Sequence, residues 1–151
     1  MNLWLLDASI LLASEDPDDD HHRDSRRLLE GNDPLATLDL AFYEVTNVAI
    51  SSWRDSSAAH RLRSRVAAVG DDGGLVRADA ALLESAVGIA DENGITVYDA
   101  AYVAAARALD GQLVSCDVRD LVSRGLALLP GDAVKRRSAR EDDFPGQPSA
   151  P

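Results

Sequence analysis

Residues 2–12 have the sequence NLWLLDASILL, and this stretch decides how the chain folds. The apolar run 2–6 predicts a short buried strand, and the second apolar run, 10–12, predicts a helix. Asp7 stands between them. A carboxylate at the end of a buried strand is costly without a partner, and ligands of open α/β sheets bind at the carboxyl ends of the strands. Asp7 therefore indicates either a ligand site at a sheet edge or a simple cap of the following helix.

Short strands and helices alternate along the rest of the chain. The apolar and periodic segments predict strands at 2–6, 34–37, 75–76, 112–116 and 127–129, and helices at 10–13, 22–29, 38–54, 60–69, 79–93, 99–109 and 118–124. This alternation predicts an α/β fold with a central, mostly parallel sheet. We expect one domain over residues 1–137 and a disordered, proline-rich tail over 138–151.

The composition limits the class of protein. With 151 residues, 46% of them apolar, the chain is long enough for one domain with its own core. It has no apolar run long enough to cross a membrane, no basic segment before its first apolar run, and one cysteine. We therefore expect a cytoplasmic protein without a signal peptide or an internal disulfide.

The net charge of −11 repels nucleic acid, so a phosphate-containing substrate would need a metal ion or a local basic patch. The candidate patch is the cluster of Lys135, Arg136, Arg137 and Arg140 near the start of the tail.

Four acidic residues differ from ordinary surface charges. Asp7 and Asp117 each follow a predicted strand, so in a parallel sheet both emerge at the same edge. Asp99 lies in the first turn of an alanine-rich helix, which it could also cap. Glu44 lies between apolar residues on one helical stripe, with no lysine or arginine one turn away.

Carboxylates that converge without basic partners repel each other, and a divalent cation removes that penalty. All-oxygen ligands favour Mg²⁺ or Mn²⁺ over zinc or copper. Such an ion polarises a phosphoryl oxygen and activates water. The four acids therefore predict metal-dependent hydrolysis of phosphodiester bonds, although a chain with 26 acidic residues offers many chance groupings.

Four sequence blocks that contain these acids resemble the PIN-domain nucleases, and most closely the VapC-type toxins of bacterial toxin–antitoxin pairs. The blocks are LLDAS at 5–9, FYEV at 42–45, VYDAAYVA at 97–104 and LVSCD at 113–117. The resemblance implies a PIN-like three-layer fold that is usually dimeric. It also implies Mg²⁺- or Mn²⁺-dependent endoribonuclease activity on RNA, blocked by a cognate antitoxin whose tail occupies the site.

The resemblance assigns roles residue by residue. The matching positions are Asp7, Glu44, Asp99 and Asp117 for metal binding and catalysis, with Ser9, Ser115 and Asp120 as candidate supporting residues.

Three other functions fit parts of the sequence. A receiver domain with a phospho-accepting aspartate would need a second acid beside Asp7 and a lysine at a late strand end, whereas the one lysine, Lys135, lies beyond the last predicted strand. An aspartyl phosphatase would need an aspartate two residues after the first, where this chain has Ser9. A catalytically silent PIN fold that acts through protein contacts stays open.

Overall fold

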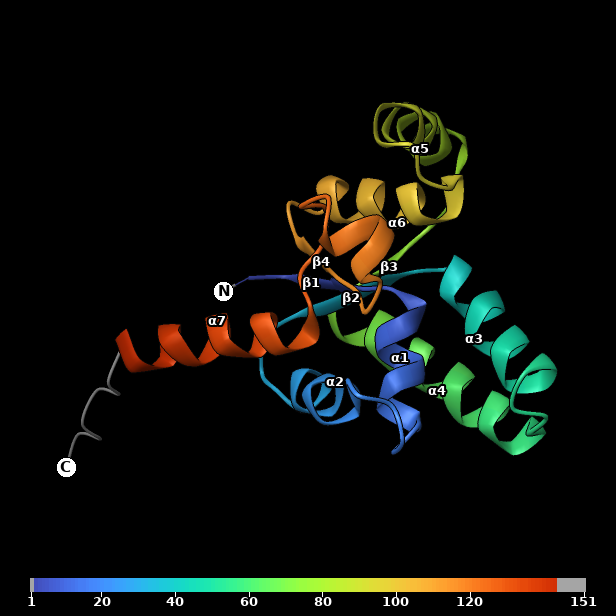
Figure 1. The fold of residues 1–151 in the computed structure, drawn as a ribbon, viewed down its shortest axis with the longest axis vertical. Helices are drawn as coiled ribbons and strands as arrows, with labels where there is room; N and C mark the ends of the chain where they lie inside the picture. The colour runs from blue at the N-terminus through green and yellow to red at the C-terminus, as the bar shows by residue number, and fades with distance from the viewer. Residues whose placement is uncertain (1, 144–151) are drawn as a thin grey trace.

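The computed structural model describes residues 2–143 and forms three layers around a central sheet (Figure 1). The four strands are β1 (Trp4–Leu6), β2 (Leu35–Leu38), β3 (Leu75–Val76) and β4 (Gln112–Val114), in the order β3-β2-β1-β4. All three pairings are parallel, which confirms the predicted α/β class. The predicted strand at 127–129 is reduced to a single parallel bridge between Val114 and Leu128.

Helices cover both faces of the sheet. They are α1 (Ala8–Glu15), α2 (His22–Leu29), α3 (Leu40–Ser51), α4 (Ser56–Gly73), α5 (Ala80–Asn93), α6 (Val97–Ala108), the short π-helix η1 (Val118–Val122) and α7 (Pro130–Asp143). Helix α6 packs on β1, β2 and β4 and carries α5 on its outer side. Helices α1 to α4 lie on the opposite side, with α4 against β2 and β3 (Figure 1).

Strand β1 forms the centre of the core. Trp4, Leu5 and Leu6 are fully buried because β1 has a strand on each edge and helices on both faces. Burying each of these side chains stabilises the fold by roughly 1.5–3 kcal/mol. The Trp4 indole Nε1 donates a hydrogen bond to Asp33 at 2.8 Å, so the one polar atom of this side chain is also satisfied.

Helix α7 has no counterpart among the predicted elements. Pro130 stands at its first position, where the missing N–H and the fixed φ of proline suit a helix. Only Pro130, Ala133 and Val134 of this helix are buried, so its sequence shows little apolar periodicity. A charged contact helps to hold it, because the Arg140 guanidinium donates to Asp33 at 3.0 Å.

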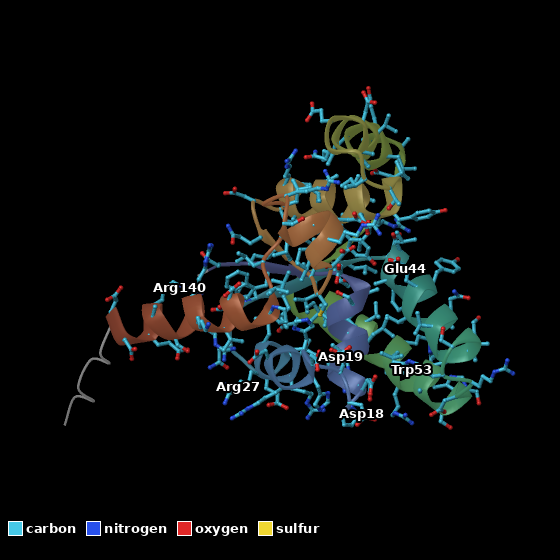
Figure 2. The ribbon with its side chains drawn as sticks, in the orientation of Figure 1. Asp18, Asp19, Arg27, Glu44, Trp53 and Arg140 are labelled. Carbon is cyan, nitrogen blue, oxygen red and sulfur yellow. The ribbon has the colours of Figure 1, made fainter. Side chains whose placement is uncertain are left out.

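The predicted tail needs a correction at its start. Residues 138–143 continue α7, and residues 144–151 lie outside the described part of the chain. The basic cluster near this boundary is partly engaged within the protein: Arg136 donates to Gln112, and Arg137 donates to the carbonyl of Arg27. Figure 2 shows Arg27 and Arg140 on the opposite side of the molecule from Glu44. The role of this cluster as an RNA-binding patch stays a prediction.

Of the helices that begin earlier than predicted, α1 and α4 do so for the same reason. An aspartate caps each of them: Asp7 precedes α1, and the Asp55 carboxylate accepts the N–H of Ala58 at the start of α4. None of the helices within residues 2–143 combines the length and the apolar character needed to cross a membrane.

Candidate metal centre

Asp7 and Asp117 lie at the carboxyl ends of adjacent parallel strands. The Asp7 N–H donates to the Val114 carbonyl at 3.3 Å, which holds the two strand ends together. Both aspartates also cap helices: Asp7 Oδ1 accepts the N–H of Ser9 at 3.0 Å, and Asp117 Oδ1 accepts the N–H of Asp120 at 2.9 Å. The two interpretations of Asp7 are therefore compatible, because capping and a ligand site occupy the same sheet edge.

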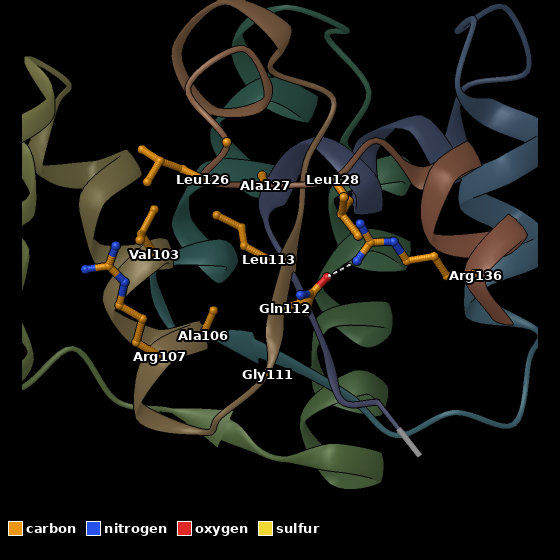
Figure 3. Close-up of a pocket in the computed structure, with 11 residues that line it drawn as sticks. Val103, Ala106, Arg107, Gly111, Gln112, Leu113, Leu126, Ala127, Leu128 and Arg136 are labelled. Carbon is orange, nitrogen blue, oxygen red and sulfur yellow. Dashed lines mark hydrogen bonds between the residues drawn. The ribbon is translucent and has the colours of Figure 1, made fainter. Parts of the chain in front are cut away.

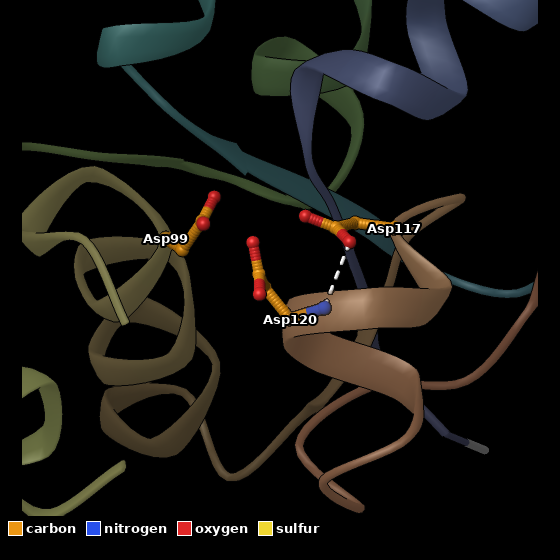
Figure 4. Close-up of side chains that lie close together, drawn as sticks. All are labelled: Asp99, Asp117 and Asp120. Carbon is orange, nitrogen blue, oxygen red and sulfur yellow. Dashed lines mark hydrogen bonds between the residues drawn. The ribbon is translucent and has the colours of Figure 1, made fainter. Parts of the chain in front are cut away.

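Three carboxylates form the tightest acidic group in residues 2–143. One oxygen from each of Asp99, Asp117 and Asp120 lies within 4.8 Å of the other two (Figure 4). Asp99 is the third residue of α6 and does not cap that helix. The cap is Thr96, whose Oγ1 accepts the Asp99 N–H at 3.1 Å, and this leaves the Asp99 carboxylate to face the other two acids.

Asp7 and Glu44 lie outside this group of three, and their carboxyl groups interact with each other. Glu44 projects from α3 and accepts a hydrogen bond of 2.5 Å from the hydroxyl of Tyr102 on α6. The charge of Glu44 raises the pKa of Asp7, and the charge of Asp99 raises the pKa of Glu44. The five acids therefore interact as one set, although only three have oxygens within 4.8 Å of one another.

Two serine hydroxyls connect the ends of β1 and β4. Ser9 Oγ donates to Asp7, accepts the N–H of Cys116 at 2.9 Å and lies 3.5 Å from Ser115 Oγ. Ser115 is fully buried, and its hydroxyl accepts the N–H of Asp117 at 3.0 Å. These bonds fix the two strand ends from which Asp7 and Asp117 emerge.

Burial is the main cause of the raised pKa values in the site. Burial raises the pKa of Asp7 from 3.8 to about 6, against the lowering effect of hydrogen bonds from Ser115 and Ser9. Burial also raises the pKa of Glu44 and of Asp99, and the charges of Asp117 and Asp120 raise the pKa of Asp99 further. Burial and the charges of neighbouring acids are the causes that raise the pKa values of Asp7, Glu44 and Asp99. Each of these carboxyl groups is therefore costly to ionise without a cation.

The site has the ligand chemistry of a hard divalent cation. Mg²⁺ binds oxygen at about 2.0–2.1 Å, so ligand oxygens on opposite sides of the ion lie about 4 Å apart. The oxygens of Asp99, Asp117 and Asp120 lie within 4.8 Å of one another, whereas oxygens on one such ion lie at most about 4 Å apart, so the three side chains would rotate inward to bind one ion. The neighbouring cation, Arg119, is 92% exposed and stands 3.7 Å from Asp120, so it neutralises the group only weakly.

A cavity of about 290 Å³ lies elsewhere, between α6, β4 and residues 125–128 (Figure 3). Arg136 donates to Gln112 on one side of it, and Arg107 stands on the other side. None of the seven candidate site residues lines this cavity, so it is not the centre predicted from the sequence.

Tyr102 is the functional candidate that the sequence reasoning missed. It lies three residues after Asp99 on α6, and residues at this spacing share a helix face. That spacing could have placed it beside the acids, but its contact with Glu44 depends on how α3 and α6 pack.

Comparisons with known proteins bear on the chain as a whole. The family model of the PIN domain matches residues 4–140. Ribonuclease VapC3 of Pyrobaculum aerophilum is 30% identical over 131 residues, which cover 83% of this chain and 96% of that protein.

Two solved structures share the fold. A chain from a toxin–antitoxin complex of Klebsiella pneumoniae has a TM-score of 0.65 at 18% identity, covering 83% of this chain and 96% of its own. VapC20 of Mycobacterium tuberculosis, a toxin that cleaves the sarcin–ricin loop, has a TM-score of 0.61 at 20% identity, covering 77% and 91%.

Proposed function

Because this chain belongs to the PIN-domain family, we propose that it is a metal-dependent endoribonuclease that acts as the toxin of a toxin–antitoxin pair. The observation that carries the proposal is the convergence of Asp99, Asp117 and Asp120 from two separate elements. The family match and the ribonuclease relative support an RNA phosphodiester as the bond that is hydrolysed.

The proposed residues that bind Mg²⁺ or Mn²⁺ are Asp7, Glu44, Asp99 and Asp117, with Asp120 as a further ligand beside Asp99 and Asp117. When bound, the ion supplies a Lewis acid for the phosphoryl oxygen and lowers the pKa of a water molecule. The protein supplies the geometry. Helix caps and serine hydroxyls hold Asp7 and Asp117, and the α6 cap at Thr96 fixes the turn that carries Asp99.

Removing the metal tests this function directly. We expect the purified protein to cleave RNA with Mg²⁺ or Mn²⁺ and to lose all cleavage in EDTA, with recovery when the metal is restored. The same ions should raise the midpoint of thermal unfolding, because a ligand at 100 times its Kd stabilises the folded state by about 2.7 kcal/mol. Cleavage that persists in EDTA, with no thermal shift from Mn²⁺, would point to a contaminating nuclease and contradict the proposal.

Tyr98 is a candidate contact for an unpaired base of the RNA. It directly precedes Asp99 and is 61% exposed, so its ring is accessible to a ligand beside the acids. Stacking of a base on an aromatic ring contributes about 1–3 kcal/mol. We therefore expect Tyr98→Ala to raise KM for a single-stranded oligoribonucleotide by about fivefold or more, while Tyr98→Phe, which keeps the ring, leaves KM near the parent value. Equal KM values for all three proteins would exclude this contact.

The proposed partners are a cognate antitoxin and a second copy of the chain, in the cytoplasm. The Klebsiella pneumoniae relative was solved as a toxin–antitoxin complex, which supports the first. Leu83 and Val87 are exposed apolar side chains one turn apart on α5, and such neighbouring apolar side chains support a partner surface there. The acidic site favours an antitoxin segment that presents a basic side chain. Co-purification with the neighbouring gene product tests this, and recovery of the chain alone would count against it.

A further inference from the structure

The hydroxyl of Tyr102 donates its hydrogen bond to one of the acids of the site. Tyr102 is 2% exposed, and its hydroxyl donates to Glu44 Oε1 at 2.5 Å across the space between α6 and α3. A buried tyrosine hydroxyl needs a partner, and here the group that accepts its proton is one of the five acids. The ring is held by the core, so the position of the hydroxyl is fixed.

Glu44 depends on this bond for its orientation. Within residues 2–143, Tyr102 is the side chain that donates a hydrogen bond to Glu44, and no arginine, lysine or histidine forms an ion pair with it. A glutamate side chain has three rotatable bonds, and Glu44 is only partly buried, so packing alone does not hold its carboxylate in one place.

We propose that Tyr102 is a positioning residue that holds the Glu44 carboxylate toward the metal centre, an inference that rests on the proposed function. The bond occupies Oε1 and leaves Oε2 without a partner among the described side chains. A neutral hydroxyl suits this role better than a basic side chain would. An arginine or lysine at this place would orient Glu44 equally well, but its positive charge would repel the cation that the site binds.

A simpler explanation is that Tyr102 fills the core and its hydroxyl bonds to the nearest acceptor. The two explanations differ in what removal of the hydroxyl does. If Tyr102 acts through Glu44, the loss should depend on the Glu44 carboxylate, whereas a packing role should not.

A double-mutant cycle on Mn²⁺ binding separates these explanations. The proteins are the parent, Tyr102→Phe, Glu44→Ala and the double variant, each titrated with Mn²⁺ by calorimetry. Groups that orient metal ligands typically change metal affinity by about 10- to 100-fold when they are removed. We expect Tyr102→Phe to weaken Mn²⁺ binding by about tenfold in the parent and by less than about twofold in the Glu44→Ala background, where the acceptor is gone. Cleavage by Tyr102→Phe should recover at high Mn²⁺.

Tyr43→Phe is the matched control, because Tyr43 adjoins Glu44 on α3 but is 79% exposed and has no hydrogen-bond partner for its hydroxyl among the described residues. Circular dichroism verifies that each variant is folded. Unchanged Mn²⁺ affinity in Tyr102→Phe, or an equal loss in both backgrounds, overturns the positioning role and leaves the proposed function standing. A parent protein that binds no Mn²⁺ overturns the proposed function and this inference with it.

Discussion

Replacing Asp99 with asparagine is expected to abolish metal-dependent RNA cleavage while leaving the protein folded. Asp99 faces both Asp117 and Asp120, so its loss removes one of three converging charges. Metal-ion stabilisation of a transition state is worth several kcal/mol, and about 1.4 kcal/mol corresponds to a tenfold change in rate. We therefore expect the cleavage rate to fall by about a thousandfold or more.

The fold should tolerate this substitution for a specific reason. The Thr96 cap uses the backbone N–H of residue 99 and not its side chain, so the start of α6 is unaffected. Neutralising Asp99 also removes a repulsion, because the charges of Asp117 and Asp120 disfavour its ionised form. Thermal unfolding without metal should therefore occur at the parent temperature or above it.

Asp91→Asn provides the control for this experiment. Asp91 is an exposed acid on the neighbouring helix α5, and it receives the same chemical change away from the site. Initial rates on a labelled RNA should match the parent for Asp91→Asn and fall to the EDTA background for Asp99→Asn. An Asp99→Asn protein that cleaves as fast as the parent would show that Asp99 holds no catalytic metal.

The sequence predicts those elements whose local signals agree with their environment. Strand β1 is a continuous apolar run and is buried on every side, and α2 has the predicted bounds, 22–29. Helix α7 could not be predicted in this way, because few of its side chains are buried and polar contacts such as Arg140 with Asp33 help to hold it. Partners that are distant in the chain leave no periodic pattern in the sequence.

The site also contains residues whose placement follows from local sequence and residues whose placement depends on tertiary packing. Asp7 and Asp117 follow apolar strands, so their shared edge follows from parallel pairing. The sequence does not decide the role of Asp120, because the direction of its side chain depends on η1, a π-helical turn whose residues do not follow the usual helical period. The bond between Tyr102 and Glu44 depends on the packing of α6 against the rest of the molecule, which no local pattern records.

Asp7→Asn is expected to stabilise the metal-free protein while removing its activity. Burial raises the pKa of Asp7 to about 6, so the folded protein binds this proton more tightly than the unfolded chain does. The stabilisation from the protonated form is complete below about pH 4 and is lost as the pH rises through about 6. At pH 7.5 the ionised Asp7 costs about 3 kcal/mol relative to its neutral form, as an order of magnitude.

Asparagine avoids that cost at every pH and keeps the helix cap, because its side-chain oxygen can still accept the N–H of Ser9. Without metal at pH 7.5, we expect Asp7→Asn to unfold about 4–8 °C above the parent, which corresponds to about 2 kcal/mol for a domain of this size. The difference should shrink at pH 5, where the parent carries the proton. Asp79→Asn is the control, since Asp79 caps α5 through Leu82 but is exposed, and its substitution should change stability little at either pH.

Saturating Mn²⁺ should reverse the order of stability. The ion compensates the buried charge in the parent but has a weaker site in Asp7→Asn, so the parent should gain more. Such a reversal would mean that the carboxylate is kept at the end of β1 at a cost to the metal-free fold, as expected of a residue retained for function. Two results would contradict this prediction: an Asp7→Asn protein that is less stable than the parent without metal, or a change in unfolding temperature that is the same at pH 5 and pH 7.5. Either would show that Asp7 is a structural cap whose burial does not destabilise the metal-free fold.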